Sequence, residues 1–247
     1  MTHAAGALRA PLLVLALACS AVLSGCAPLV IGGAAATTAV VVTDRRTSGI
    51  QLEDQNIAFK AQSQISQQLG EAARIDATAY EGQVLLTGDV PDEAAKAKAT
   101  AIAQKIDNVK GVYNQLRVGP AAPFSTRSND TWLASKVRTA LLNARYVPSG
   151  TINVTVDRSE VYLMGKVTQV EGDYAATTAA GVGGITKVVK LFNTISREEA
   201  VRLSGSNSGQ PPAPPTSTQA PIETGTPASG TGGGTDTGSG IQAMPIK

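Results

Sequence analysis

The sequence predicts an α+β protein with two tandem copies of one small helix–strand–strand–helix–strand unit. Three observations lead to this prediction. Residues 84–88 (VLLTG) recur 77 positions later as residues 161–165 (VYLMG). Before each of these strands, apolar residues recur at every fourth position, which is typical of an amphipathic helix. Once a leader and a Gly/Pro/Ser/Thr-rich tail are set aside, about 150 residues remain, and that length can bury two small cores.

The elements of each repeat follow from its periodicity. The first helix carries a stripe of three apolar residues in both repeats: Ile57, Ala61 and Ile65 in repeat one, and Leu133, Val137 and Leu141 in repeat two. Two alternating strands follow, with turns expected at residues 81–82 and 158–159. A second helix is expected over residues 91–106 and again over residues 170–180, and a β-rich segment closes each repeat.

Residues 1–25 are predicted to be a lipoprotein signal peptide. The apolar run over residues 11–23 is too short for a membrane-spanning helix and leads into Leu-Ser-Gly-Cys, ending at Cys26. This ending resembles the bacterial lipobox, whose cysteine is acylated and becomes the first residue of the mature protein; the alternative is an ordinary signal peptide with a chance cysteine. Residues 26–53 would form a lipidated, flexible tether. Ala27 in place of Asp resembles the sorting signal for the outer membrane, with the protein on its periplasmic face.

The scarcity of histidine and cysteine excludes several classes of site. The only histidine is His3, and the only cysteines are Cys19 and Cys26. If the chain is cleaved before Cys26, no Ser-His-Asp or Cys-His nucleophile, Cys/His zinc site or intramolecular disulfide can form. We therefore predict a protein without enzymatic activity, cofactor or metal; a carboxylate-only or Ser–Lys enzyme is the alternative left open. With 21 Lys+Arg against 19 Asp+Glu, no nucleic-acid partner is expected.

Both repeats carry a pattern that resembles the BON domain. Each opens with an aspartate, Asp54 or Asp130, and continues with the i/i+4/i+8 apolar helix and a Val-x-Leu-x-Gly type of strand end. The closing pattern Val-x-x-Val at residues 109–112 matches Ile-x-x-Val at residues 185–188. Two such units behind a lipobox resemble the dual-BON outer-membrane lipoproteins, over about residues 12–195. The resemblance implies αββαβ sandwich domains and binding of anionic phospholipid, chiefly by the second domain.

The second repeat places apolar residues where the first has polar ones. Trp132 and Leu142 replace Asn56 and Ser66 on the side of the first helix that faces away from the apolar stripe. An outward tryptophan beside cations suits a membrane interface, because its ring prefers the headgroup level and lysine or arginine is attracted to anionic lipid. The candidate phospholipid-binding residues are Trp132, Ser135, Lys136, Arg138, Thr139, Leu142 and Tyr174.

Two of these assignments have a structural alternative. Trp132 could instead cover the other domain or pack on the linker at the helix start. Tyr174, which replaces Lys98 of the first repeat, could equally be a tyrosine at the edge of the core. Charge agrees in sign with the lipid hypothesis, since residues 54–118 contain 7 basic and 8 acidic side chains and residues 128–195 contain 7 and 5.

The predicted boundaries are a first domain over 54–118, a linker over 119–127, a second domain over 128–202 and a disordered low-complexity tail over 203–247. Gly88 and Gly165 are expected to serve the strand-end turn rather than a ligand. We predict that the second domain binds anionic phospholipids and supports outer-membrane integrity under envelope stress. The rival hypothesis is a protein-interaction adaptor for the envelope assembly or division machinery, and the oligomeric state stays open.

Overall fold

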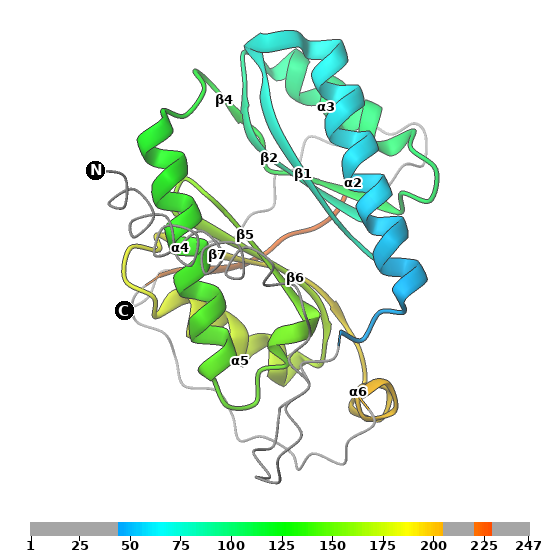
Figure 1. Cartoon of the computed structure of the whole chain (residues 1–247), viewed down its shortest axis with the longest axis vertical. Coiled ribbons are helices and arrows are strands. Elements are labelled where there is room, and N and C mark those ends of the chain that lie inside the picture. The colour runs from blue at the N-terminus through cyan, green and yellow to red at the C-terminus, as the bar shows by residue number, and fades with distance from the viewer. Residues whose placement is uncertain (1–43, 205–219, 229–247) are drawn as a thin grey trace, which may run out of the picture. The chain divides into compact units, whose positions relative to one another are not determined.

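The computed structural model describes residues 44–204 and 220–228, and these form two αββαβ sandwich domains (Figure 1). The predicted α+β class and the tandem arrangement are confirmed. The predicted signal peptide, the acylation site Cys26 and the tether up to residue 43 lie outside the described residues.

Domain 1 is a mixed sheet with two helices on one face. Its elements are α2 (Ser48–Leu69), a 3-10 turn (Gly70–Ala72), β1 (Arg74–Tyr80), β2 (Gln83–Val90), α3 (Glu93–Gln104), β3 (Gly111–Asn114) and β4 (Arg117–Val118). The strand β2 lies between β1, which is antiparallel to it, and the parallel β3 and β4. The predicted stripe of α2 is buried in this core: Ile57, Ala61 and Ile65 pack with Val84 and Leu86 of β2.

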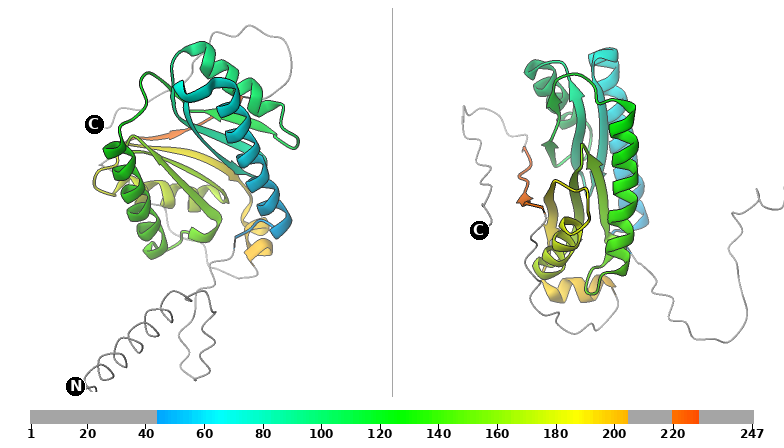
Figure 2. Two further views of the ribbon diagram at one scale, coloured as in Figure 1. Left: turned by 45° about the horizontal axis from the view of Figure 1, so that its top comes forward. Right: turned by 90° about the vertical axis from the view of Figure 1, so that its left-hand side faces the viewer.

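Domain 2 repeats this order with longer strands. Its elements are α4 (Phe124–Asn143), a 3-10 turn (Ser149–Thr151), β5 (Ile152–Asp157), β6 (Glu160–Val167), α5 (Gln169–Ala180), β7 (Lys187–Thr194), α6 (Arg197–Ser204) and β8 (Ile222–Thr224). The sheet has the order β5-β6-β7-β8. The predicted stripe of α4 packs in one core with α5 and with Val161 and Leu163 of β6. Figure 2 shows each sheet with its helices from two further sides.

The opening aspartate of each repeat holds the hairpin turn. The turns at 81–82 and 158–159 have φ between 48° and 80° at both positions, so their N–H groups cannot join the strand ladder. The buried Asp54 carboxylate accepts hydrogen bonds from both N–H groups of the first turn, at 2.8 and 2.9 Å. Asp130 does the same in the second turn, with both bonds at 2.9 Å. The repeated aspartate therefore has a structural role.

The two repeated glycines lie inside strands, so the prediction that they serve a turn is wrong. A Cβ on Gly88 of β2 would lie 2.1 Å from the carbonyl oxygen of Arg74. A Cβ on Gly165 of β6 would lie 2.7 Å from the carbonyl oxygen of Thr151. Glycine is required at both positions because the backbone at the start of β1, or just before β5, approaches too closely for a side chain.

Both helices that open the domains begin earlier than predicted. The helix α2 starts at Ser48, inside the predicted tether, because Thr47 caps it by accepting a hydrogen bond from the N–H of Ile50. The helix α4 starts at Phe124, inside the predicted linker, directly after Pro123. Apolar spacing alone did not show these extra turns, because they are exposed and carry no residue of the core stripe.

The two domains contact each other. One apolar cluster contains residues of both sheets: Tyr80, Leu85 and Tyr113 of domain 1, and Tyr162, Met164, Val189 and Leu191 of domain 2. The Tyr80 hydroxyl lies 3.0 Å from the Thr151 hydroxyl, and burial raises the pKa of Tyr80. Arg158 pairs with the buried carboxylate of Asp89 across the same contact, at 2.6 Å.

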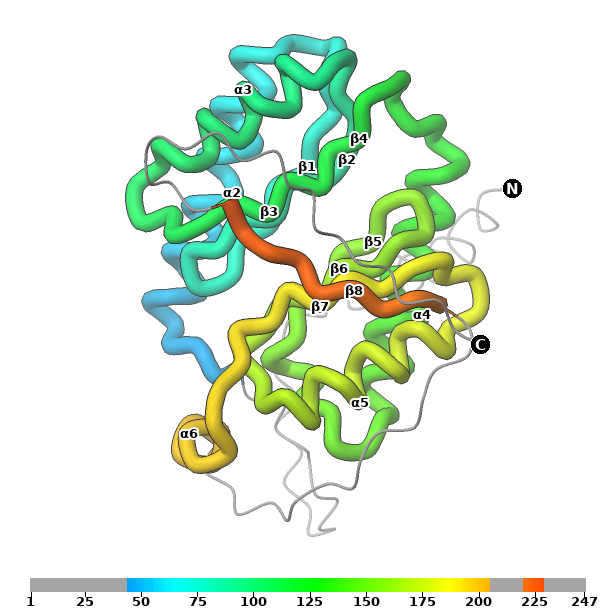
Figure 3. The backbone as a smooth tube through the Cα atoms, turned by 180° about the vertical axis from the view of Figure 1, so that it is seen from behind, coloured from blue at the N-terminus to red at the C-terminus, as the bar shows by residue number. Residues whose placement is uncertain are grey.

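Part of the predicted tail belongs to the fold. The prediction that residues 203–247 are disordered is wrong for residues 220–228, whose strand β8 runs parallel to β7 (Figure 3). The Gly/Pro/Ser/Thr-rich composition of the tail does not predict a strand here. The strand forms because backbone groups at the edge of β7 supply its hydrogen-bonding partners. The helix α6 also continues to Ser204, past the predicted boundary. Residues 205–219 and 229–247 of the predicted tail lie outside the described residues.

Candidate functional site

The outward side of α4 carries two of the predicted residues as exposed apolar groups. Trp132 is 59% exposed and Leu142 is 59% exposed, whereas Leu133 on the opposite side is 1% exposed. The alternative in which Trp132 is covered by the other domain or by the linker does not hold, because more than half of the residue's surface is exposed to solvent. The outward direction of this side chain thus follows from the buried stripe behind it.

Phe124, which was not among the candidate residues predicted from the sequence, extends this face. Its ring is 75% exposed, with the Arg127 guanidinium carbon 5.5 Å from the ring centroid. Phe124 and Leu142 are 18 residues apart, which is about five turns at 3.6 residues per turn, so they lie on the same side of α4. The residue was assigned to the linker, where no helical direction could be given to it. We call Phe124, Trp132 and Leu142 the apolar face of α4.

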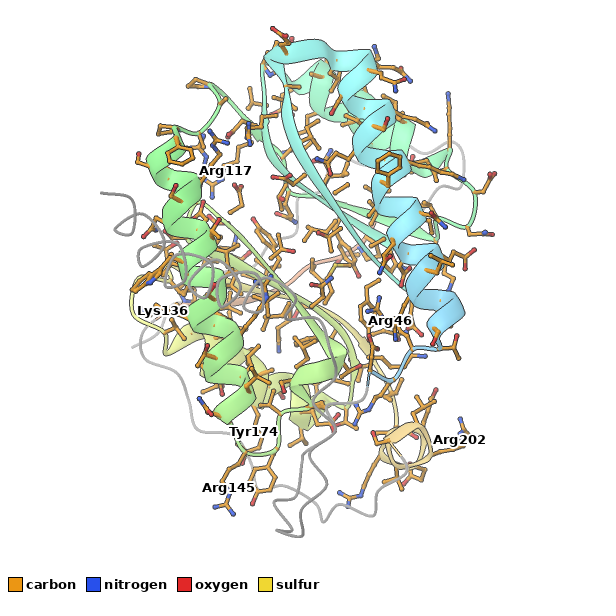
Figure 4. All side chains as sticks on the ribbon, in the orientation of Figure 1. Arg46, Arg117, Lys136, Arg145, Tyr174 and Arg202 are labelled. Atoms are coloured by element: carbon orange, nitrogen blue, oxygen red, sulfur yellow. The ribbon has the colours of Figure 1, made fainter. Side chains whose placement is uncertain are left out.

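Lys136 is held directly beside Trp132. Its Nζ lies 4.4 Å from the indole centroid and donates a hydrogen bond of 2.7 Å to the carbonyl oxygen of Gly183. Figure 4 labels Lys136 on α4. A cation over a tryptophan ring is attracted by the electrons of the ring face. The same residues border a shallow groove of about 470 Å³ between α4 and the loop at residues 182–183, which Ser135 and Thr139 also line.

Three of the predicted residues have other contacts. Arg138 donates a hydrogen bond of 2.9 Å to the carbonyl oxygen of Val154, so it points toward β5. Ser135 and Thr139 are exposed, but their hydroxyls donate to backbone carbonyls one turn earlier in α4, at 3.1 and 2.9 Å. The groove therefore brings together Trp132, Lys136 and these two hydroxyls, and Arg138 lies to one side.

Tyr174 belongs to a different cluster. Its ring centroid lies 5.4 Å from that of Tyr146, just beyond the end of α4, and Arg145 lies over the Tyr146 ring at 5.9 Å (Figure 4). Tyr174 is half-buried. The structure does not bring it to the groove beside Trp132, and its place at the edge of the core matches the structural alternative.

The outward side of α2 in domain 1 is less polar than the comparison of the two repeats suggested. Leu52 is 60% exposed and Phe59 is 74% exposed on α2. Phe59 occupies the position in repeat one that Ser135 occupies in repeat two. The sequence comparison of the two repeats considered the positions of Trp132 and Leu142 but not this one. An outward aromatic residue is therefore not unique to the second domain, whereas the lysine fixed over an indole is the feature that distinguishes α4.

A second cleft, of about 450 Å³, lies between the domains and is lined by Asp76, Asp89, Asp130 and Asp157. This cleft bears on the carboxylate-only enzyme that the sequence left open as an alternative. Asp89 is paired with Arg158, and Asp130 holds a turn, so neither carboxylate is free for acid–base chemistry. Burial, together with Asp89 and Asp130, raises the pKa of Asp157. Two carboxylates, those of Asp76 and Asp157, remain for the enzymatic alternative.

Within residues 44–204 and 220–228, no group of three His, Cys, Asp or Glu side chains could hold a metal ion. No helix in this part of the chain is long and apolar enough to cross a membrane.

Comparison with known proteins gives one family and several relatives. The sequence pattern described as BON domain matches residues 53–120 and 129–196. The chain is 38% identical to outer membrane lipoprotein DolP of Haemophilus influenzae over 172 residues, which are 69% of this chain and 89% of that protein. It is 32% identical to a 21 kDa hemolysin of Actinobacillus pleuropneumoniae, over 62% of this chain and 79% of that protein. Osmotically-inducible protein Y of Escherichia coli is 31% identical over 45% of this chain and 57% of its own length.

Proposed function

Because this chain belongs to the BON domain family, we propose that it is a lipid-anchored protein of the outer membrane whose second BON domain binds anionic phospholipid. Acylated Cys26 would hold the protein on the periplasmic face. The apolar face of α4, with Lys136, would contact the membrane. Similarity to a protein named outer membrane lipoprotein supports the location, since the chain spans most of that relative's length.

The observation that carries this proposal is the pairing of an exposed indole with a fixed cation. Trp132 keeps more than half of its surface in water, and Lys136 is held over the ring by a backbone carbonyl. Burying a large apolar side chain contributes about 1.5–3 kcal/mol, and a lysine near an anionic surface adds about 1 kcal/mol. Phe124 and Leu142 add further apolar surface on the same side of α4.

These contributions suffice for measurable binding to anionic vesicles at low salt, and the anchor strengthens the contact further. An acylated protein already lies near the bilayer, so the second contact is effectively intramolecular and needs little affinity of its own. We expect the first domain to serve as a spacer or as a surface for a partner. Binding of this kind would support outer-membrane integrity under envelope stress, as the resemblance to dual-BON lipoproteins implies.

The adaptor hypothesis has one observation in its favour. Leu52 and Phe59 are exposed apolar residues on domain 1 and are not part of the face on α4. A protein of the envelope assembly or division machinery could bind there. This contact and the lipid contact would use different helices, so single substitutions separate them.

Vesicle flotation tests the proposal. The described residues of both domains lie in one compact unit, so a soluble form that begins at residue 41 retains both domains. We expect it to float with phosphatidylglycerol vesicles at low salt and to bind phosphatidylcholine vesicles much more weakly. Trp132→Glu should reduce binding at least about tenfold, since tenfold corresponds to about 1.4 kcal/mol. Phe59→Glu is the matched control on α2 and should bind like the unmodified protein. Absence of binding at low salt would favour the adaptor hypothesis.

A further inference from the structure

The segment 220–228, which we call the strap, contacts both domains. Its strand β8 joins the sheet of domain 2, and its last residue, Ala228, pairs with Val112 of β3 in domain 1. Figure 3 shows the strap running along β7 and on toward β3. The matched BON patterns end at residue 196, so the strap is an addition to the two-domain unit.

In domain 2 the strap is held by backbone pairing, an ion pair and burial. The N–H of Val188 donates to the carbonyl oxygen of Pro221 at 2.7 Å, and the N–H of Gly225 donates to the carbonyl oxygen of Lys190 at 3.0 Å. Glu223 pairs with Lys187 of β7 at 2.7 Å. Ala220 is 2% exposed and belongs to the core of this domain. The first half of the strap is thus a fourth strand of the sheet.

In domain 1 the strap ends in a reciprocal pair of hydrogen bonds. The N–H of Ala228 donates to the carbonyl oxygen of Val112 at 2.8 Å, and the N–H of Val112 donates to that of Ala228 at 3.2 Å. Val112 lies in the core of domain 1. Gly111 makes room for the strap, because a Cβ there would lie 3.0 Å from Cβ of Pro227.

Between these two ends the strap crosses the boundary between the domains. A Cβ on Gly225 would lie 2.2 Å from Cδ2 of Leu191, so only glycine fits this crossing without displacing that side chain. Leu191 belongs to the apolar cluster that the two sheets share. The strap therefore lies against the contact that holds the domains together.

We propose that the strap locks the two BON domains in one arrangement. Each end is hydrogen-bonded to the sheet of a different domain, so the domains cannot move apart or slide without breaking one set of bonds. Because the strap is part of the chain, it rebinds at high local concentration whenever it is released. It also covers β7, which would otherwise be an open edge strand able to pair with another chain.

The test uses the soluble form that begins at residue 41 and a variant that releases the strap. This release variant is a double variant that combines two substitutions. Ala220→Asp places a charge in the core of domain 2, and Glu223→Lys replaces the partner of Lys187 by a like charge. The matched control is Thr226→Lys, which gives the same net change in charge at an exposed position of the strap. Both cysteines precede residue 41, so spin labels at Ala97→Cys of α3 and Gln169→Cys of α5 are unique.

Two measurements are made on each protein. Amide hydrogen exchange should become at least tenfold faster at Val188 and Val112 in the release variant, while Leu163 of the central strand β6 keeps its protection. The distribution of distances between the two spin labels should become at least twofold wider. The control should match the unmodified protein in both measurements.

Two results would overturn the proposal. Unchanged exchange at Val188 and Val112 would show that these contacts do not hold the segment. Faster exchange with an unchanged distance distribution would show that the strap is bound but does not lock the domains. If the double variant also loses protection at Leu163, the single variant Glu223→Lys is read in its place, with the same two criteria.

Discussion

The turn-holding role of Asp130 makes a quantitative prediction about stability. Its carboxylate is 5% exposed and accepts two hydrogen bonds of 2.9 Å from the N–H groups of the turn at 158–159. Asp130→Ala removes both acceptors at once. The turn has positive φ at both residues and cannot pair these groups elsewhere without changing its shape.

The magnitude follows from the two lost bonds. A hydrogen bond to a charged group contributes about 1.5–3 kcal/mol, and the half-buried turn recovers part of this from water. We therefore expect Asp130→Ala to lower the free energy of unfolding by about 2–4 kcal/mol. For a chain of this size, 1 kcal/mol corresponds to about 2–4 °C in the melting temperature, so a loss of about 5–15 °C is expected.

Thermal and urea unfolding, followed by circular dichroism, measure this loss. Asp107→Ala, at an exposed position of domain 1, is the control and should melt with the unmodified protein. Asp54→Ala should cost more than Asp130→Ala, because Asp54 also pairs with Arg46 at 2.9 Å. A melting temperature for Asp130→Ala within about 1 °C of the control would refute the assigned role.

Two further predictions concern charged groups. Arg45→Met should lower the free energy of unfolding by about 3 kcal/mol, measured by urea unfolding at pH 7. The substitution breaks a bidentate ion pair with Glu171 at 2.8 Å, in which the arginine side chain is 5% exposed. Burial opposes ionisation of Glu171, but Arg45 and the N–H of Thr168 outweigh it and hold the Glu171 pKa below its ordinary 4.5. The stabilisation is therefore complete above pH 4.5 and should be lost as pH falls through the lowered pKa of Glu171 in the folded protein. Asp157→Asn should have the opposite sign and raise stability at pH 7 by less than about 1 kcal/mol, because burial, Asp89 and Asp130 raise the pKa of Asp157 and penalise its ionised form. That gain should vanish in melts below pH 3.8, where the carboxyl is protonated in both states, and a gain that persists there would contradict this cause.

The features that sequence predicted are those that depend on local periodicity. The repeat and the buried stripes of α2 and α4 follow from the spacing of apolar residues, and the outward direction of Trp132 follows from the stripe of α4. Each of these needs only the geometry of one helix or one strand.

The features that it missed depend on contacts between distant residues. Asp54 and Asp130 were recognised as repeated, but their partners lie 27 to 29 residues away. The strap has the composition of a linker, and it pairs because β7 and β3 supply the opposite backbone groups. Phe124 was missed because α4 begins earlier than apolar spacing shows.

The fluorescence of Trp132 tests the lipid-contact proposal most directly, because this is the only tryptophan of the chain. With the soluble form at low salt, phosphatidylglycerol vesicles should shift its emission to shorter wavelength, and bromine-labelled acyl chains in the same vesicles should quench it. In a variant with Trp132→Phe and Phe59→Trp, which moves the fluorophore to α2, neither change should occur. An emission spectrum of the unmodified protein that stays the same with saturating vesicles, brominated or not, would contradict a membrane contact through α4.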